Sequence, residues 1–250
     1  MPALSAESLL AVWEAGAEQP LARRALLLLS AARPGTAYGT WAQTPLGRRD
    51  AELLRLRAEL FGSRLVSVVA CPNCGSQLQL TFDAADLGAI PSLAAPGADA
   101  DAELLTLTSP PYTLRYRLPN STDVLAAGQS ESVEAARWLL LRRCLQSAER
   151  NQAAVTPEEL PAEVVDALAA QMARADPQAD LQVDVSCPVC GKEWATTLDV
   201  AAYLWAEIDR WARRLLREVH ALASAYGWRE ADILALSAAR RQAYLELIRD

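Results

Sequence analysis

Histidine is nearly absent from this chain of 250 residues, which contains only His220. Mechanisms that need two imidazoles are therefore excluded, and most hydrolase and oxidoreductase sites would lack their usual base. Lysine is equally scarce, because Lys192 is the single lysine among 24 basic residues. We attribute the preference for arginine to genome composition rather than to a binding role. These scarcities disfavour an enzyme.

Positive net charge and long hydrophobic runs are also missing. The formal net charge is −7, and non-specific binding to nucleic acid rests on clustered Lys and Arg, so DNA and RNA binding is disfavoured. Apolar stretches such as residues 25–29 fall far short of the roughly 20 residues that span a bilayer. The first residues lack the basic segment of a signal peptide. We therefore expect a cytoplasmic, globular protein that does not associate with membranes.

Known catalytic motifs are absent as well. The chain has no P-loop, no G-x-G-x-x-G and no G-x-S-x-G, and its carboxylates are scattered without an acid/base cluster. We predict no catalytic residue, no residue that binds an organic cofactor and no small-molecule substrate.

Cysteine, by contrast, is concentrated in two C-x-x-C pairs. Without a secretion signal, disulfides are disfavoured and such pairs favour metal binding. Zinc in a site of four thiolates has no open position, which predicts a structural role for one ion per chain. Rubredoxin-like iron is the alternative metal. The four candidate ligands are Cys71, Cys74, Cys187 and Cys190. Cys144 stands alone in an apolar helical series and is expected in the core.

The two cysteine segments form an internal repeat. Residues 71–83 read CPNCGSQLQLTFD and residues 187–199 read CPVCGKEWATTLD. An apolar or alternating run stands on each side of both segments, which predicts strand, knuckle, strand. Gly75 and Gly191 follow the second cysteine of each pair, where positive φ suits a tight turn. We expect two hairpins that are marginal alone and are joined by one zinc ion.

These features predict an α+β fold that is mainly α-helical, in which the two hairpins form a split zinc ribbon with a helical insertion. The expected units are an N-terminal helical segment (1–62), the split ribbon (63–83 plus 181–199), an acidic, mainly helical insertion (84–180) and a C-terminal helical module (200–250).

Apolar periodicity predicts the terminal helices. Three are expected at 6–15, 20–32 and 48–61, and the loop between the last two carries Tyr38 and Trp41 as core residues or a contact patch. A long helix is expected from Leu204 to Gly227, followed by helices at 230–236 and 238–248, the last capped by Ser237.

The insertion is expected to begin with a helical turn and a loop, at 84–109. A strand follows, in which Leu114, Tyr116 and Leu118 alternate with polar residues. A helix capped by Ser121 or Asp123 should then run to about Arg150, and a second helix spans about 157–174. Between residues 151 and 184, Arg174 is the only basic residue among several acidic ones.

Two surface features are explained by structure rather than by a binding role. The arginines of the long helix alternate with acidic residues, which favours a solvated face of ion pairs. These arginines are Arg210, Arg213, Arg214 and Arg217. Most tryptophans near the C-terminus are expected in the core, and one or two could anchor a partner. They are Trp194, Trp205, Trp211 and Trp228.

Several segments together resemble a known family. They are GRRDAELLRLRAELFG, the two CPxCG hairpins, YTLRYRLPNSTD, LLLRRC and the tail from LWAEID onward, and the most specific are RLPNSTD at 117–123 and the stretch at 226–248. From about Ala25 to its end, the chain resembles the baseplate proteins related to hub assembly proteins of T-even phages. Such proteins are encoded in contractile phages and in phage-tail-like contractile injection systems.

This resemblance implies a non-enzymatic subunit or assembly chaperone whose partners are other baseplate or hub proteins, and which is incorporated into a phage-like particle if it is a permanent subunit. The phage relatives often lack a full set of metal cysteines, so zinc would be a local stabiliser. The alternative from the residues is a zinc-ribbon nucleic-acid-binding regulator, although only Lys192 and Arg64 supply positive charge near the knuckles.

Overall fold

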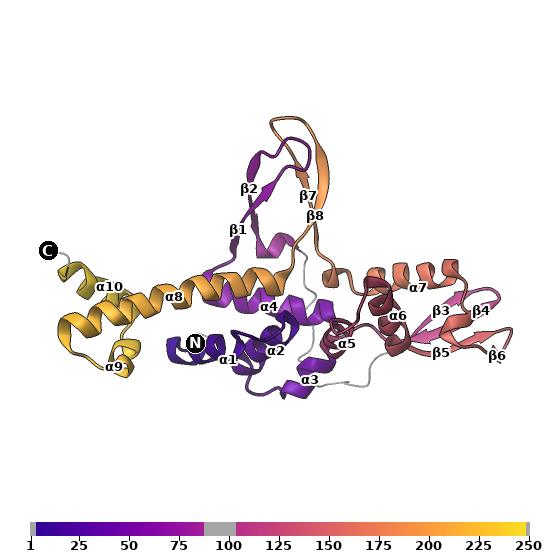
Figure 1. Ribbon diagram of the computed structural model, residues 1–250, viewed down its shortest axis with the longest axis horizontal. Helices are drawn as coiled ribbons and strands as arrows, with labels where there is room; N and C mark the ends of the chain where they lie inside the picture. Colours follow the sequence, from indigo (N-terminus) through magenta and orange to yellow (C-terminus); the bar gives the residue numbers. More distant parts are fainter. Residues whose placement is uncertain (1–3, 88–103, 249–250) are drawn as a thin grey trace.

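The computed structural model describes residues 4–87 and 104–248, and in it the chain has the outline of a T (Figure 1). Helices form the long horizontal bar, and two hairpins stand on it as a tower. At one end of the bar lies a small sheet, and at the other lie the last two helices. The expected class, mainly helical with small antiparallel sheets, is confirmed.

The helical body is built from the predicted N-terminal helices and the start of the long helix. Ser5 caps the first helix by accepting the Ser8 amide, and Gly62, with φ 87°, ends the fourth. One helix was expected as loop, and it buries the ring of Trp41 while Tyr38 stays exposed. This helix is too short for its sequence to show a helical period. The helices of the body are α1 (Ala6–Gly16), α2 (Leu21–Ala32), α3 (Tyr38–Gln43), α4 (Leu46–Phe61) and α8 (Val200–Tyr226).

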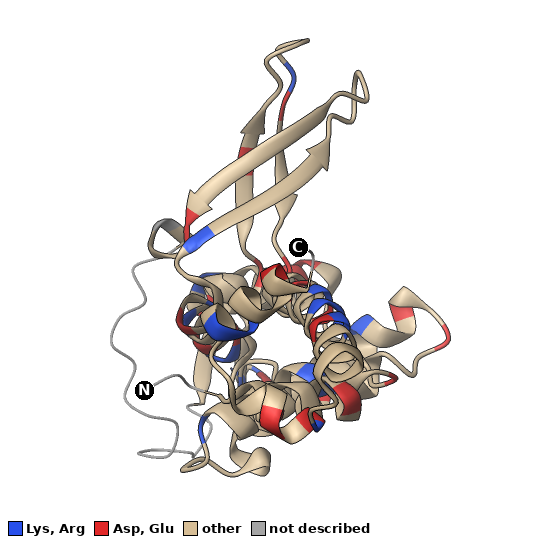
Figure 2. Cartoon of the chain, turned by 90° about the vertical axis from the view of Figure 1, so that its left-hand side faces the viewer, with Lys and Arg blue, Asp and Glu red and all other residues tan. Residues whose placement is uncertain are grey.

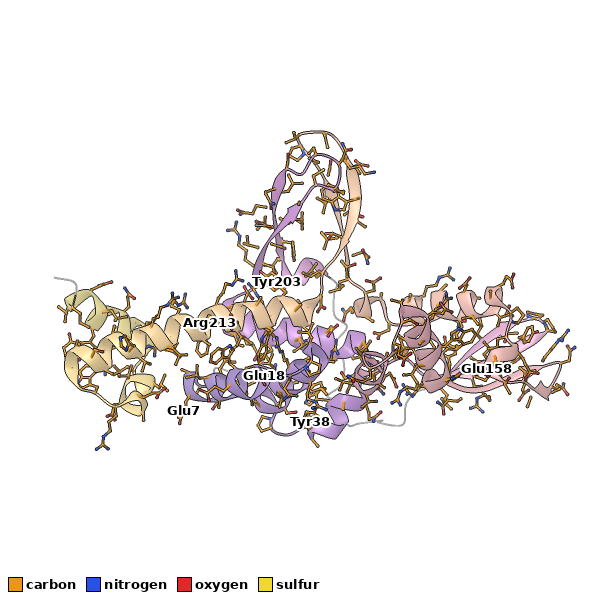
Figure 3. The ribbon with its side chains drawn as sticks, viewed as in Figure 1. Glu7, Glu18, Tyr38, Glu158, Tyr203 and Arg213 are labelled. Atoms are coloured by element: carbon orange, nitrogen blue, oxygen red, sulfur yellow. The ribbon has the colours of Figure 1, made fainter. Side chains whose placement is uncertain are left out.

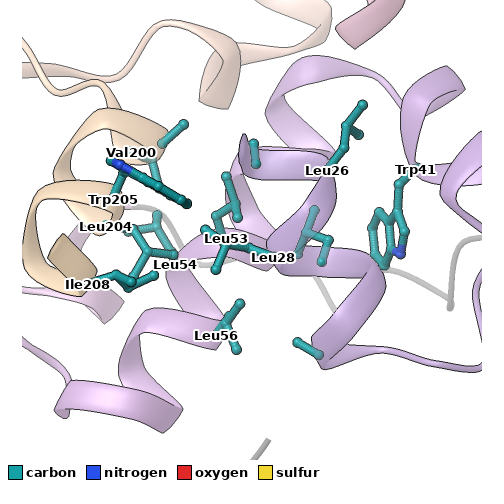
Figure 4. Close-up of a cluster of buried hydrophobic side chains, with 14 of the residues drawn as sticks. Leu26, Leu28, Trp41, Leu53, Leu54, Leu56, Val200, Leu204, Trp205 and Ile208 are labelled. Atoms are coloured by element: carbon teal, nitrogen blue, oxygen red, sulfur yellow. The ribbon is translucent and has the colours of Figure 1, made fainter. Parts of the chain in front are cut away.

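Leucines of α2, α4 and α8 form the main core, together with Trp41 and Trp205 (Figure 4). Leu28, Leu53 and Leu204 are fully or almost fully buried at its centre. Burying one such side chain contributes about 1.5–3 kcal/mol, so the body has ample apolar surface to fold on its own packing.

The tower consists of two separate antiparallel hairpins, β1 (Arg64–Ala70) with β2 (Gln77–Asp83) and β7 (Gln182–Ser186) with β8 (Glu193–Thr197). Alternate residues point inward, and Leu65 and Val185 are the buried positions of these strands. On the outer face, Val66 is 43% exposed and Val68 is 62% exposed. Figure 2 shows few charged residues on the tower and many on the helices. The tower therefore has little core of its own.

The inserted segment contains a four-stranded antiparallel sheet that the sequence did not predict in full. The strand containing Leu114 and Tyr116 is confirmed, but residues 145–150 form a strand where a continuing helix was expected. Residues 105–109 were expected as a loop but form a strand. This strand and the strand at 145–150 pair with opposite edges of the strand that contains Leu114. The expected loop at residues 88–103 lies outside the described residues. The strands are β3 (Leu105–Ser109), β4 (Tyr112–Tyr116), β5 (Leu145–Arg150) and β6 (Ala153–Ala154).

The described part of the inserted segment also contains three helices and the 3-10 turns η1 (Ala84–Leu87), η2 (Pro157–Glu159) and η3 (Pro177–Ala179). Two helices stand where a single helix was expected before Arg150. Neither Ser121 nor Asp123 is the N-cap of either helix. Asn120 caps the first helix and Ser132 caps the second, because each side chain accepts at least one hydrogen bond from a backbone amide in the first turn. The helices are α5 (Ser121–Ala127), α6 (Val133–Cys144) and α7 (Ala162–Ala175).

The C-terminal module follows the prediction closely. Gly227 ends α8 in the left-handed conformation, and Ser237 caps the last helix. A small cluster of Tyr226, Trp228 and Tyr244 closes this end, with the rings of Tyr226 and Trp228 stacked at 4.7 Å. The remaining helices are α9 (Glu230–Ala235) and α10 (Ala238–Leu247). No described helix is long and apolar enough to cross a membrane.

Candidate metal centre

The two knuckles at the top of the tower have the same backbone geometry. The Gly75 amide donates to the Cys71 carbonyl over 2.9 Å, and the Gly191 amide donates to the Cys187 carbonyl over 2.9 Å. Both glycines adopt positive φ, 72° and 69°. The first cysteine of each pair is buried at the end of a strand, and the second is exposed in the turn. The repeat seen in the sequence is therefore a repeat of structure.

The four sulfur atoms of the knuckles meet at one point between the hairpins. Cys71 Sγ lies 3.7 Å from Cys190 Sγ, and Cys74 Sγ lies 3.7 Å from Cys187 Sγ. All four lie within 4.8 Å of one another. A tetrahedral ion with Zn–S bonds of about 2.3 Å places its sulfurs about 3.8 Å apart. The arrangement therefore fits one metal ion, shared by two segments far apart in the chain.

Local hydrogen bonds favour the thiolate form at the exposed cysteines. The Ser76 hydroxyl, 3.3 Å from Cys74 Sγ, and the Ser76 amide lower the pKa of Cys74 to about 6. The Asn73 side chain and the Lys192 amide lower the pKa of Cys190. Burial raises the pKa of Cys187 to about 11. Metal ligands must be thiolates, so the lowered pKa values of Cys74 and Cys190 suit these two residues to metal binding.

Cys144, the fifth cysteine, lies outside this cluster. It is buried at the end of α6, and burial raises the pKa of its thiol to about 11. Its expected role in packing is confirmed.

A tyrosine that the sequence did not single out anchors the tower to the body. The Tyr203 hydroxyl of α8 donates to the Val66 carbonyl and accepts the Val66 amide, both over 3.0 Å. Arg57 of α4 lies over the Tyr203 ring at 5.7 Å and forms a two-pronged ion pair with Glu207. Figure 3 labels Tyr203 at the foot of the tower. One tyrosine on an amphipathic helix gives no sequence signal for such a role.

The RLPNSTD segment forms the joint between the body and the insertion. Asp123 is fully buried and accepts hydrogen bonds from Arg117 at 2.9 Å and Arg143 at 2.7 Å. Burial alone would raise the pKa of Asp123, but the bonds from Arg117, the Asn120 amide and Arg143 lower it below its usual value. This carboxylate is therefore charged, and it links α5 to α6 and to the residue that follows β4.

The same segment reaches across to α3 and α4. The Asn120 side-chain amide donates to Gln43 over 2.9 Å, and Arg49 donates to the Ser121 hydroxyl over 3.1 Å. Arg49 also pairs with Asp50 of α4. Burial raises the pKa of Asp50 to about 6, although Arg49 opposes the shift. The most distinctive motif of the sequence thus serves as a structural joint.

Some charged residues elsewhere form ion pairs. On α8, Arg213 pairs with Asp209 and Arg214 with Glu218, so the ion pairs expected from the alternating charges are confirmed for these two arginines. The acidic residues of the insertion are partly neutralised, because α6 supplies arginines to Glu158 and Asp166. His220 is exposed, away from the metal centre.

The T-shaped chain thus combines a helical body, a polar joint and a cluster of four cysteines at the top of its tower. A protein-family comparison places the chain more specifically: residues 36–202 match the family of the T4 bacteriophage base plate protein, and the chain belongs to that family. The match includes both knuckles and the RLPNSTD segment, but the distinctive stretch at 226–248 lies outside it. No curated protein and no solved structure matches the chain significantly.

Proposed function

We propose that this protein is a non-enzymatic structural or assembly protein of a phage-like baseplate or hub, within a contractile injection system. It acts through contacts with other baseplate or hub proteins. The observation that carries this proposal is the family match, which spans helices α3 and α4 of the body, the tower, the inserted segment and the joint. The T shape supports it, since a helical bar with a projecting tower offers separate surfaces to different neighbours.

The four knuckle cysteines bind one structural zinc ion per chain, which makes the two hairpins a split zinc ribbon. The sulfur separations near 3.7 Å support this assignment. Four thiolates would complete the coordination of zinc and leave no position for water or substrate, so the site holds structure rather than performing chemistry. Iron would fit the same ligands, and metal analysis distinguishes the two.

The acidic net charge and the paired arginines of α8 favour protein partners over nucleic acid. The protein would be made in the cytoplasm and act there during assembly. A permanent subunit would remain in the finished particle, whereas a chaperone would be absent from it.

Deletion of the gene tests the assembly role. We expect particles without a complete baseplate, or no particles, and rescue by the wild-type gene in trans. Electron microscopy and mass spectrometry of purified particles also decide between subunit and chaperone. Normal, active particles from the deletion strain would contradict the proposal.

A further inference from the structure

A groove on the body, between the α1–α2 turn and α8, has features of a binding site. It has a volume of about 460 Å³. Two indole rings and three alanines line it, together with Leu21 and three charged residues. Figure 3 labels Arg213, which lines the groove from α8. The lining residues are Trp13, Ala17, Leu21, Arg24, Ala202, Trp205, Ala206, Asp209 and Arg213.

Arg24 is held rigidly in this groove. Its guanidinium lies 4.7 Å from the centre of the Trp205 ring. Its Nε donates to the Gly16 carbonyl over 2.9 Å, and Nη2 donates to the Ala17 carbonyl over 2.7 Å. Stacking and carbonyl contacts fix the orientation of the cation without neutralising its charge.

Arg24 also differs from every other arginine that is buried or half-buried in the described ranges. Each of the others has a carboxylate within salt-bridge distance, whereas Arg24 has none. The others are Arg33, Arg49, Arg55, Arg57, Arg117, Arg143 and Arg241.

Asp209, the carboxylate that lines the groove, is already engaged. It accepts the Trp13 indole N–H over 3.0 Å and pairs with Arg213 at 2.9 Å. These two bonds, from Arg213 first and then Trp13, lower the pKa of Asp209. Guanidinium groups therefore outnumber carboxylates among the lining residues of the groove, and its one carboxylate is already hydrogen-bonded.

We propose that this groove binds an acidic side chain of a partner polypeptide, with the carboxylate on Arg24 and a neighbouring apolar residue against the indole rings. Charge complementarity favours a carboxylate, because it would pair with Arg24, which alone among the half-buried arginines of the described ranges has no carboxylate partner. The alanines on both walls leave room for an extended segment. The identification of the partner as a baseplate protein rests on the proposed function. The preference of the groove for a carboxylate does not depend on it.

The test uses the purified full-length protein and two synthetic peptides, acetyl-Leu-Glu-Leu-amide and its Gln analogue, in calorimetric titrations. We expect the Glu peptide to bind about tenfold more tightly than the Gln peptide, as for one charge-assisted hydrogen-bonded pair. Arg24→Gln should remove this difference. The matched control is Arg23→Gln, because Arg23 is the adjacent exposed arginine and contacts Gln19 instead; it should retain the difference.

A second variant guards against misfolding of Arg24→Gln, since Arg24 also binds two backbone carbonyls. Ala206→Phe fills the groove and leaves Arg24 in place, so it should abolish binding of both peptides while helicity is unchanged. Equal binding of the Glu and Gln peptides, no binding of either, or an equal loss in Arg23→Gln would overturn the proposal. None of these outcomes bears on the gene-deletion test of the baseplate role.

Discussion

The tower and the helical body are held together by different means. The body packs leucines from helices near both ends of the chain into one extensive core. The tower has two short hairpins, little buried apolar surface and four cysteines at its top. An isolated two-stranded hairpin is marginal in water, so the tower needs an additional link, and the body does not. A metal ion held by the four cysteines would therefore stabilise the tower and contribute little to the body.

The largest expected effect comes from breaking the metal centre with Cys187→Ser. Loss of one thiolate should release the ion and open the tower, because structural zinc supplies much of the folding free energy of small metal-bound units. We expect amide exchange in 64–83 and 182–197 to accelerate about 100-fold or more, with little change in α2 and α4. Cys144→Ala is the control and should leave zinc content and tower exchange unaltered. Exchange that accelerates equally throughout the body would contradict a local role.

The reverse perturbation weakens the body and spares the tower. Leu53 is fully buried on α4, so Leu53→Ala should lower the free energy of unfolding by about 2–5 kcal/mol through lost burial and a residual cavity. Urea unfolding measures the loss, and zinc content should remain that of the wild type. A variant that also loses zinc under native conditions would show that the tower depends on the body core.

The connection between the two regions is tested by Tyr203→Phe. This change removes a hydroxyl that both donates to and accepts from the Val66 backbone. We expect a loss of about 0.5–1.5 kcal/mol, seen as faster amide exchange at the foot of β1. Tyr244→Phe is a matched control, because it also removes a tyrosine hydroxyl but lies on α10, beside the C-terminal end of α8 and far from Val66. No change at Val66 in Tyr203→Phe would remove Tyr203 as the anchor.

A smaller effect concerns pH at the body side of the joint. Burial raises the pKa of Asp50 from 3.8 to about 6, so the folded state binds this proton more tightly than the unfolded state does. The resulting stabilisation is complete below pH 3.8 and is lost as the pH rises through about 6. Between about pH 5.5 and about pH 7.5, the wild type should lose about 1 kcal/mol relative to Asp50→Asn. Parallel pH profiles of the two proteins in urea unfolding would refute the assignment.

The predictions from sequence succeeded where a local pattern decides structure. The apolar period of α8, the αL glycine at its end and the Ser237 cap are local signals, and each is confirmed. The convergence of the four cysteines was also predictable, because the repeat placed equivalent ligands in equivalent turns. The ion itself stays a prediction.

Long-range pairing set the limit of what the sequence could show. Strand β5 reads LQSAER and buries only Ala148, so no alternation distinguishes it from the helix before it. The structure of β5 depends on pairing with β4, and two helices separate these strands in the sequence. Tyr203 and Arg24 were missed for a similar reason, since their partners lie on other elements.

The zinc content of the purified, full-length protein tests the central claim most directly. Elemental analysis with native mass spectrometry should find one zinc ion per chain, because the knuckles share a single tetrahedral site. Removing it by a chelator should open the tower while the helical body stays folded. Two ions per chain, or a metal-free protein whose tower remains protected from exchange, would contradict the account.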